Sequence, residues 1–215
     1  MKERYIVSIG IILAICISAG LGAVFTFTDI YDEVKKSIVE IICLSCLKLT
    51  PKTSMEFTFK TANGQNHPDF VLENLTKGPV FLHYSEDDCA ACDIMFPVIK
   101  QFFNIEFPKE TSYHTITAFR NQTVPYIYIY LDDKNTPSQW LDSFDIYDKD
   151  LIKGLPIFTV VTLGYEHSGD IKPYYTTLYG AFKDNDEQRL QLLTELMDES
   201  FDLYNENKEG FEPHH

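Results

Sequence analysis

Four of the five cysteines in this 215-residue chain fall into two C-x-x-C pairs, Cys43/Cys46 and Cys89/Cys92. Two thiols at this spacing can form a bridge, exchange electrons with other thiols or donate two ligands to a soft metal ion. A four-thiolate zinc site usually separates its pairs by about 15–20 residues. Here a strand, a helix and another strand are predicted between the two pairs, which weakens the zinc interpretation but leaves it open.

The two pairs have different predicted surroundings. A short apolar run at 80–84 (VFLHY) predicts a buried strand, and a helix is predicted from about Cys89 to Phe103. The unpaired N–H groups and the positive dipole end of a helix N-terminus favour a thiolate, so Cys89 can act as a nucleophile. Cys43 and Cys46 lie near the carboxyl end of a predicted stalk helix, where the dipole has the opposite sign. They suit a structural disulfide, a second dithiol that relays electrons, or metal ligation.

The elements that would position these cysteines follow from periodicity and turn signals. Further strands are predicted at 55–60, 126–131, 157–163 and 174–179, and further helices at 67–75, from Thr136-Pro137, and from near Asp184, with Glu187 placed to close a capping box. The resulting order is β-α-β-α-β-α-β-β-α. This order indicates an α/β fold with a central sheet and helices on both sides.

A family resemblance becomes visible in the segment 79–97, PVFLHYSEDDCAACDIMFP. It resembles the active-site strand and helix of the thioredoxin superfamily, including Pro97 five residues beyond the second cysteine. Gly154-Leu155-Pro156, just before a strand, looks like the cis-proline loop of that family. Gly180 and a terminal amphipathic helix follow in the same order. The resemblance covers about 55–204 and implies a thioredoxin-like, three-layer α/β/α fold with a central mixed sheet.

The resemblance also implies thiol-disulfide oxidoreductase activity on protein thiols and disulfides, with a redox-active disulfide and no other cofactor. Carried over from the family, Cys89 attacks a partner disulfide and Cys92 resolves the mixed disulfide. Leu155 and Pro156 would bind the substrate backbone. His83 stands where thioredoxins keep a buried carboxylate, so it is a candidate for proton transfer, although a histidine in a buried strand is more often an ordinary core residue.

The segment around the cysteines departs from the thioredoxin pattern. Thioredoxins often have Trp before the first cysteine, whereas this chain has the acidic run Glu86-Asp87-Asp88. Negative neighbours oppose thiolate formation, so we expect the pKa of the Cys89 thiol to be lowered less than the helix terminus alone would lower it. The dipeptide between the cysteines is Ala-Ala rather than Gly-Pro, which alters the redox poise in a direction that the sequence leaves open.

The first thirty residues predict a membrane anchor. Residues 5–27 contain no charged side chain, and a helix of that length can cross a hydrocarbon core of roughly 30 Å. The sequence therefore predicts an anchor at 1–28, a stalk helix at 29–52, a thioredoxin-like domain at 53–205 and a flexible tail at 206–215. We expect a single-pass protein whose domain is extracytoplasmic, with a membrane redox partner as a further candidate. A cleaved signal peptide is the alternative.

Charge and composition restrict the remaining possibilities. The formal net charge of −14 has the wrong sign for a nucleic-acid backbone, so no nucleic-acid partner is expected. Hydrophobic residues make up 45% of the chain, enough for a packed core. The alternative function belongs to another class: a metal-binding protein for zinc or copper, or a non-catalytic scaffold with the same fold.

Overall fold

The computed structural model describes residues 57–62, 65–148, 151–165 and 169–211. All of them belong to one compact unit, Lys48–His215. The predicted anchor at 5–27 and the predicted stalk helix at 29–52, with Cys43 and Cys46, lie outside the described residues. Within the described ranges, no helix combines the length and the apolar character that a membrane span requires.

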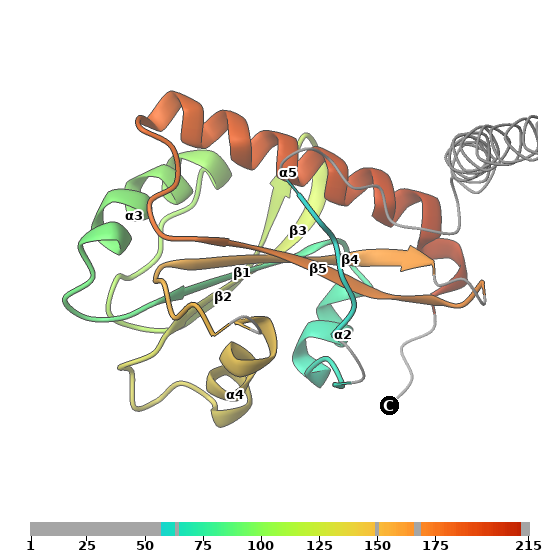
Figure 1. Cartoon of the computed structure of the whole chain (residues 1–215), viewed down its shortest axis with the longest axis horizontal. Helices are drawn as coiled ribbons and strands as arrows, with labels where there is room; N and C mark the ends of the chain where they lie inside the picture. The colour runs from blue at the N-terminus through green and yellow to red at the C-terminus, as the bar shows by residue number, and fades with distance from the viewer. Residues whose placement is uncertain (1–56, 63–64, 149–150, 166–168, 212–215) are drawn as a thin grey trace, which may run out of the picture. The chain divides into compact units, whose positions relative to one another are not determined.

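The unit is built on a five-stranded sheet with the strand order β2-β3-β1-β4-β5 (Figure 1). Strands β1 and β3 are parallel, whereas the pairs β1–β4, β2–β3 and β4–β5 are antiparallel. The sheet is therefore mixed, as predicted. Its strands are β1 Val80–Ser85, β2 Tyr113–Phe119, β3 Gln122–Tyr130, β4 Ile157–Tyr165 and β5 Ile171–Tyr179.

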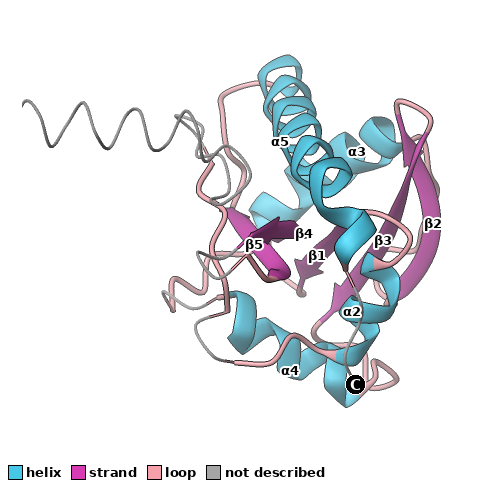
Figure 2. Cartoon of the chain, turned by 90° about the vertical axis from the view of Figure 1, so that its right-hand side faces the viewer, coloured by secondary structure: helices cyan, strands magenta, loops and turns pink. Residues whose placement is uncertain are grey.

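Helices cover both faces of this sheet. Figures 1 and 2 show α3 and α5 on one face and α2 and α4 on the other, so the described residues form three layers. The α/β class predicted from the element order is confirmed. The helices are α2 Asp69–Leu75, α3 Ala90–Phe103, α4 Ser138–Tyr147 and α5 Asp186–Asn207, followed by the short 3-10 helix η1 Lys208–Gly210.

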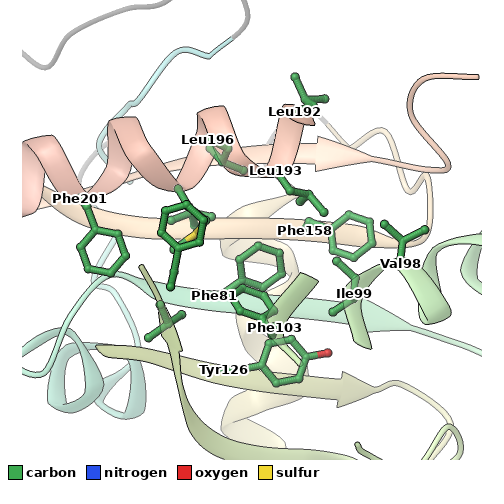
Figure 3. Packing of buried hydrophobic residues seen from close by; sticks show 14 of the residues in the cluster. Phe81, Val98, Ile99, Phe103, Tyr126, Phe158, Leu192, Leu193, Leu196 and Phe201 are labelled. Carbon is green, nitrogen blue, oxygen red and sulfur yellow. The ribbon is translucent and has the colours of Figure 1, made fainter. Parts of the chain in front are cut away.

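The alternation of side chains along β1 explains why the strand is buried throughout. Phe81 and His83 belong to the layer beneath α3 and α5, whereas Leu82 and Tyr84 face α2 and α4, and all four are fully buried. Figure 3 shows Phe81 in the first of these layers, below helix α5. Its ring centroid lies 4.9 Å from that of Phe103. A strand buried on both faces is thereby fixed in the centre of the sheet.

The structure corrects the predicted elements in several places. Strand β2 was not predicted at all, and β3 begins at Gln122 rather than at Tyr126. In the segment predicted as a strand at 55–60, the described residues 57–60 form isolated bridges, among them Lys60 with Tyr175. The backbone of Lys60 exchanges one pair of hydrogen bonds with Tyr175, which holds this segment to the edge of the sheet without forming a strand.

The predicted helix starts also shift. Pro137 occupies the N-cap position of α4 rather than the first helical position, and the hydroxyl of Thr136 donates to the carbonyl of Tyr130 instead of capping. The N-cap of α5 is Asn185, whose side chain accepts from the N–H of Gln188. The cap therefore pairs Asn185 with Gln188 and does not use Glu187.

Candidate active site

Cys89 lies at the junction between β1 and α3. Strand β1 ends at Ser85, an exposed loop of three acidic residues follows, and Cys89 is the N-cap of α3 with an extended backbone. The Sγ of Cys89 accepts a hydrogen bond from the backbone N–H of Cys92 at 3.1 Å. An N-cap acceptor is usually a hydroxyl or carboxylate oxygen. Here a sulfur takes that position, at the end of the helix that favours negative charge.

Cys89 and Cys92 form a disulfide, with their Cα atoms 5.2 Å apart. Their exposure differs: Cys92 is 2% exposed, whereas Cys89 is only partly buried. Because the second sulfur is covered, a partner thiol can approach the first more easily. The structure thus brings together the two cysteines that the sequence placed at the site.

The Leu155–Pro156 loop reaches the same end of the sheet. The peptide bond between these two residues is cis, and Ile157 opens β4. In the antiparallel pair of β1 and β4, Ile157 lies opposite Tyr84, near the end of β1 that leads into Cys89. The carbonyl of Pro156 accepts from the N–H of Gly180 at 2.8 Å. Leu155 is half-buried and makes no hydrogen bond to the residues that the structure describes.

His83 is fully buried beneath α3 and α5, among aromatic rings. Its Nδ1 lies 2.9 Å from the hydroxyl oxygen of Tyr126, and its ring centroid lies 4.6 Å from that of Phe158. Its Nε2 has no hydrogen-bond partner among the described residues. Desolvation by burial lowers the pKa of His83 to about 3, so the imidazole is neutral at physiological pH.

Three alternate tyrosines of β3 lie on the same face of the sheet as His83, and each places its hydroxyl on a polar partner. We call Tyr126, Tyr128 and Tyr130 the tyrosine row. The Tyr126 hydroxyl contacts His83, the Tyr128 hydroxyl donates to the carbonyl of Lys109 at 2.6 Å, and the Tyr130 hydroxyl donates to the carboxylate of Asp87. Sequence reasoning missed their polar roles, although the alternating run YIYIY places all three hydroxyls on one face.

Carboxylates flank the dithiol on both sides in the sequence. Glu86, Asp87 and Asp88 precede Cys89 and are exposed, and Asp88 has a left-handed backbone with φ 52°. On the other side, the carboxylate of Asp93 forms an ion pair with Lys109 at 2.5 Å. The exposed carboxylates before Cys89 therefore oppose the positive end of the α3 dipole and make the potential at Cys89 more negative.

No set of three or more histidine, cysteine or carboxylate side chains is arranged to hold a metal ion within the part of the chain that the structure describes. Cys43 and Cys46 lie outside that part, so the structure does not place them. The expectation that they form a second dithiol or bind zinc or copper therefore stays a prediction.

Comparison with family models finds no match for the sequence, and comparison with curated proteins finds none either. Among solved structures, the chain is similar to the thioredoxin from Aeropyrum pernix. The two have 14% sequence identity and a TM-score of 0.34, over 68% of this chain and 98% of that one. A likeness at this TM-score carries no conclusion about activity, so the site is interpreted from its own residues.

Proposed function

We propose that the protein is a membrane-anchored thiol-disulfide oxidoreductase that exchanges disulfides with protein substrates through Cys89 and Cys92. One observation carries this proposal: the two sulfurs are bonded at the N-terminus of α3, with the first accessible and the second covered. An accessible sulfur with its resolving neighbour at bonding distance is the minimum that disulfide exchange requires.

Thiol–disulfide exchange at Cys89 and Cys92 can either oxidise or reduce a substrate, and each direction takes two steps. With the disulfide form, a substrate thiolate attacks the Sγ of Cys89, the Cys89–Cys92 bond breaks, and Cys92 leaves as a thiolate. A second substrate thiolate then attacks the substrate sulfur of the mixed disulfide, and Cys89 leaves. Two electrons pass from the substrate dithiol to the protein, and the substrate gains one disulfide. Reduction of a substrate follows the same steps in reverse, with Cys89 as the attacking thiolate.

The position of Cys89 supports its role as the exchanging sulfur. After reduction, its thiolate lies at the N-terminus of a 14-residue helix and can accept the N–H of Cys92. Interactions of this kind lower the pKa of a thiol below its usual value near 8.5. The acidic run before Cys89 acts against this effect, so the pKa of Cys89 reflects a balance between the helix terminus and the carboxylates.

Substrate binding is proposed at Leu155 and Pro156. Leu155 has no hydrogen-bond partner among the described residues and lies at the end of β4 nearest to the end of β1. An extended substrate segment could pair with this backbone, which would bring its cysteine toward Cys89.

Proton transfer by His83 stays a proposal, and its burial restricts it. A neutral imidazole with a pKa of about 3 is a weak base for a thiol whose pKa is near 8.5. The Nε2, which has no hydrogen-bond partner in the described ranges, is the atom that would take part. The role therefore requires that water or another polar group reaches this atom when the disulfide opens.

The remaining parts of the proposal concern the first fifty-two residues. We propose that 5–27 anchor the chain in a membrane, that the domain faces an oxidising, extracytoplasmic compartment, and that Cys43/Cys46 exchange electrons with Cys89/Cys92 or with a membrane redox partner. The uncharged run in the sequence and the position of the first pair in the predicted stalk helix that follows it support these proposals.

Trapping of mixed disulfides tests the proposed activity. In a Cys92→Ser variant the resolving sulfur is absent, so adducts with substrate cysteines should accumulate on Cys89. They are detected as thiol-sensitive bands on non-reducing gels, and mass spectrometry assigns the cysteine that carries them. The double variant Cys89→Ser/Cys92→Ser is the matched control and should lose the adducts completely. Absence of adducts on Cys89 in the single variant would contradict the proposal, and stoichiometric metal in the reduced protein would favour a metal-binding function.

A further inference from the structure

The loop between β1 and Cys89 is tied to β3 and to the segment that follows it. The carboxylate of Asp87 accepts a hydrogen bond from the Tyr130 hydroxyl, and the backbone N–H of Asp87 donates to Asp132 at 2.7 Å. The N–H of Leu131 donates to the carbonyl of Ser85 at 2.9 Å, which joins the two strand ends. Asp87 is therefore held through both its backbone and its side chain.

The sheet order shows on which side these contacts lie. Strand β3 is the neighbour of β1 on one side, with Tyr130 paired to Ser85, whereas β4 is its neighbour on the other. The cis Leu155–Pro156 loop precedes β4. Asp87 is thus bound toward one side of β1, while the loop proposed to bind substrate approaches from the opposite side.

We propose that Tyr130 is a positioning residue that holds the negative charge of Asp87 on the β3 side of the loop, away from the Sγ of Cys89. The inference deepens the proposed function, on which it rests for the role of Cys89 as the attacking sulfur. Asp87 lies two residues before that sulfur in the sequence, and a free carboxylate there would stabilise the thiol over the thiolate. The Tyr130 hydroxyl instead donates a hydrogen bond that holds this carboxylate in place.

Several other charged groups surround Tyr130, Asp87 and the two cysteines. Glu86 and Asp88 lie in the same loop, Asp132 follows β3, and Glu110 acts on Tyr130 through its charge. Asp93, next to Cys92 on α3, is paired with Lys109. Among these carboxylates, Asp87 is the one whose side chain accepts a hydrogen bond from a tyrosine hydroxyl, so its effect on Cys89 should depend on that hydroxyl.

A double-mutant cycle tests the pair, because the two single variants should move the Cys89 pKa in opposite directions. Asp87→Asn keeps an acceptor oxygen for the hydroxyl but removes the charge, so the pKa should fall. Tyr130→Phe removes the restraint and leaves the charge, so the pKa should rise. The shift for Asp87→Asn should be about 0.3–0.5 pH unit, as expected for one screened charge at several ångströms, and that for Tyr130→Phe, which moves the charge without adding one, should be smaller. In the Asp87→Asn background, Tyr130→Phe should have no effect.

The measurement uses the full-length chain in its reduced form, with Cys92→Ser as the parent. The rate of iodoacetamide alkylation of Cys89 is followed against pH by mass spectrometry, and its midpoint gives the pKa of the thiol. Glu86→Gln is the matched control: it removes a carboxylate from the same loop, and the shift caused by Tyr130→Phe should persist in its background. Circular dichroism verifies that each variant is folded.

Two results would overturn the inference. If both single variants move the midpoint in the same direction, or neither moves it, Tyr130 only supports the loop. If Tyr130→Phe acts equally with and without Asp87, the two residues are not coupled. The alkylation assay contains no substrate, so it reports on the pair even if the trapping experiment fails, and the two proposals can fail separately.

Discussion

At the scale of single residues, two buried histidines make the folded protein sensitive to acid. His83 lies beneath α3 and α5, and His67 contacts the hydroxyl of Tyr147 with its Nδ1 at 3.0 Å on the other face of the sheet. Burial lowers the pKa of His67 to about 4 and that of His83 to about 3. Both side chains are therefore neutral in the folded protein and become protonated far more readily in the unfolded chain.

This difference predicts a loss of stability in acid. Between the unfolded value of about 6.5 and the folded values, the unfolded chain binds more protons, so the free energy of unfolding falls as the pH falls. Each histidine should contribute a slope of about 1.4 kcal/mol per pH unit in the middle of this window. Urea unfolding of the full-length chain in mild detergent, from pH 7 to pH 4.5, measures the slope.

Removal of a histidine should make that dependence shallower. In His83→Gln the slope should decrease by about 1.4 kcal/mol per pH unit, because one buried titrating group is gone. The exposed His114 provides the control, and His114→Gln should change the slope much less. Equal slopes in His83→Gln and the parent would show that His83 does not titrate as its burial indicates.

At the scale of elements, the contact between the start of β1 and β3 requires a glycine. A Cβ atom added to Gly78 would lie 2.0 Å from the carbonyl oxygen of Thr123, and a backbone oxygen in the sheet cannot move aside as a flexible side chain could. The turn that carries the chain into β1 therefore depends on the absence of a side chain at this position.

Gly78→Ala should destabilise the fold by about 2 kcal/mol or more, the range for forced overpacking of a well-packed region. Thermal or urea unfolding provides the measurement. The neighbouring Lys77→Ala, at an exposed position, should stay within about 0.5 kcal/mol of the parent. If the two variants have the same stability, β1 and β3 approach each other less closely here than the structure shows.

The elements with a strong hydrophobic pattern were predicted from the sequence, whereas an element with a weak pattern was missed. The buried runs at β1 and β4 are apolar on both faces and were found from the sequence, as were the helices α2 and α3. Strand β2 was missed because its residue types do not follow its burial pattern: Ile116 is exposed, whereas Thr115 and Thr117 are half-buried, as an edge strand with one partner allows. The turn between β2 and β3, Arg120-Asn121, has positive φ at both residues. Hairpin turns of this kind are usually predicted from Asn-Gly or Asp-Gly, and this sequence has neither here.

Some residues of the candidate site are recognisable from local sequence patterns, whereas others depend on how the strands pair. Cysteine spacing and the proline motif are local patterns, so Cys89, Cys92 and the Leu155–Pro156 loop could be named from the sequence. The pairing of Tyr130 with Asp87 spans 43 positions and depends on the parallel register of β1 and β3. No local pattern encodes that register, which is why the tyrosine row emerges only in three dimensions.

At the scale of the whole molecule, the proposed anchor makes a separate prediction. If 5–27 cross a membrane, the full-length chain should stay in the membrane fraction after extraction with alkaline carbonate, because an apolar helix of this length inserts in a way that salt and high pH do not reverse. A variant with two lysines in place of Ile11 and Ile12 should be released. Release of the unaltered chain, or an N-terminus that begins after 28, would contradict an uncleaved anchor.

The position of Trp140, the only tryptophan in the chain, has a spectroscopic consequence. Its ring lies 5.6 Å from that of Phe70 and 6.5 Å from that of His114, in the layer formed by α2 and α4. The disulfide belongs to α3, on the opposite face of the sheet. Intrinsic fluorescence excited at the indole band therefore monitors the attachment of α4, and the redox state of the dithiol needs a different optical or chemical label.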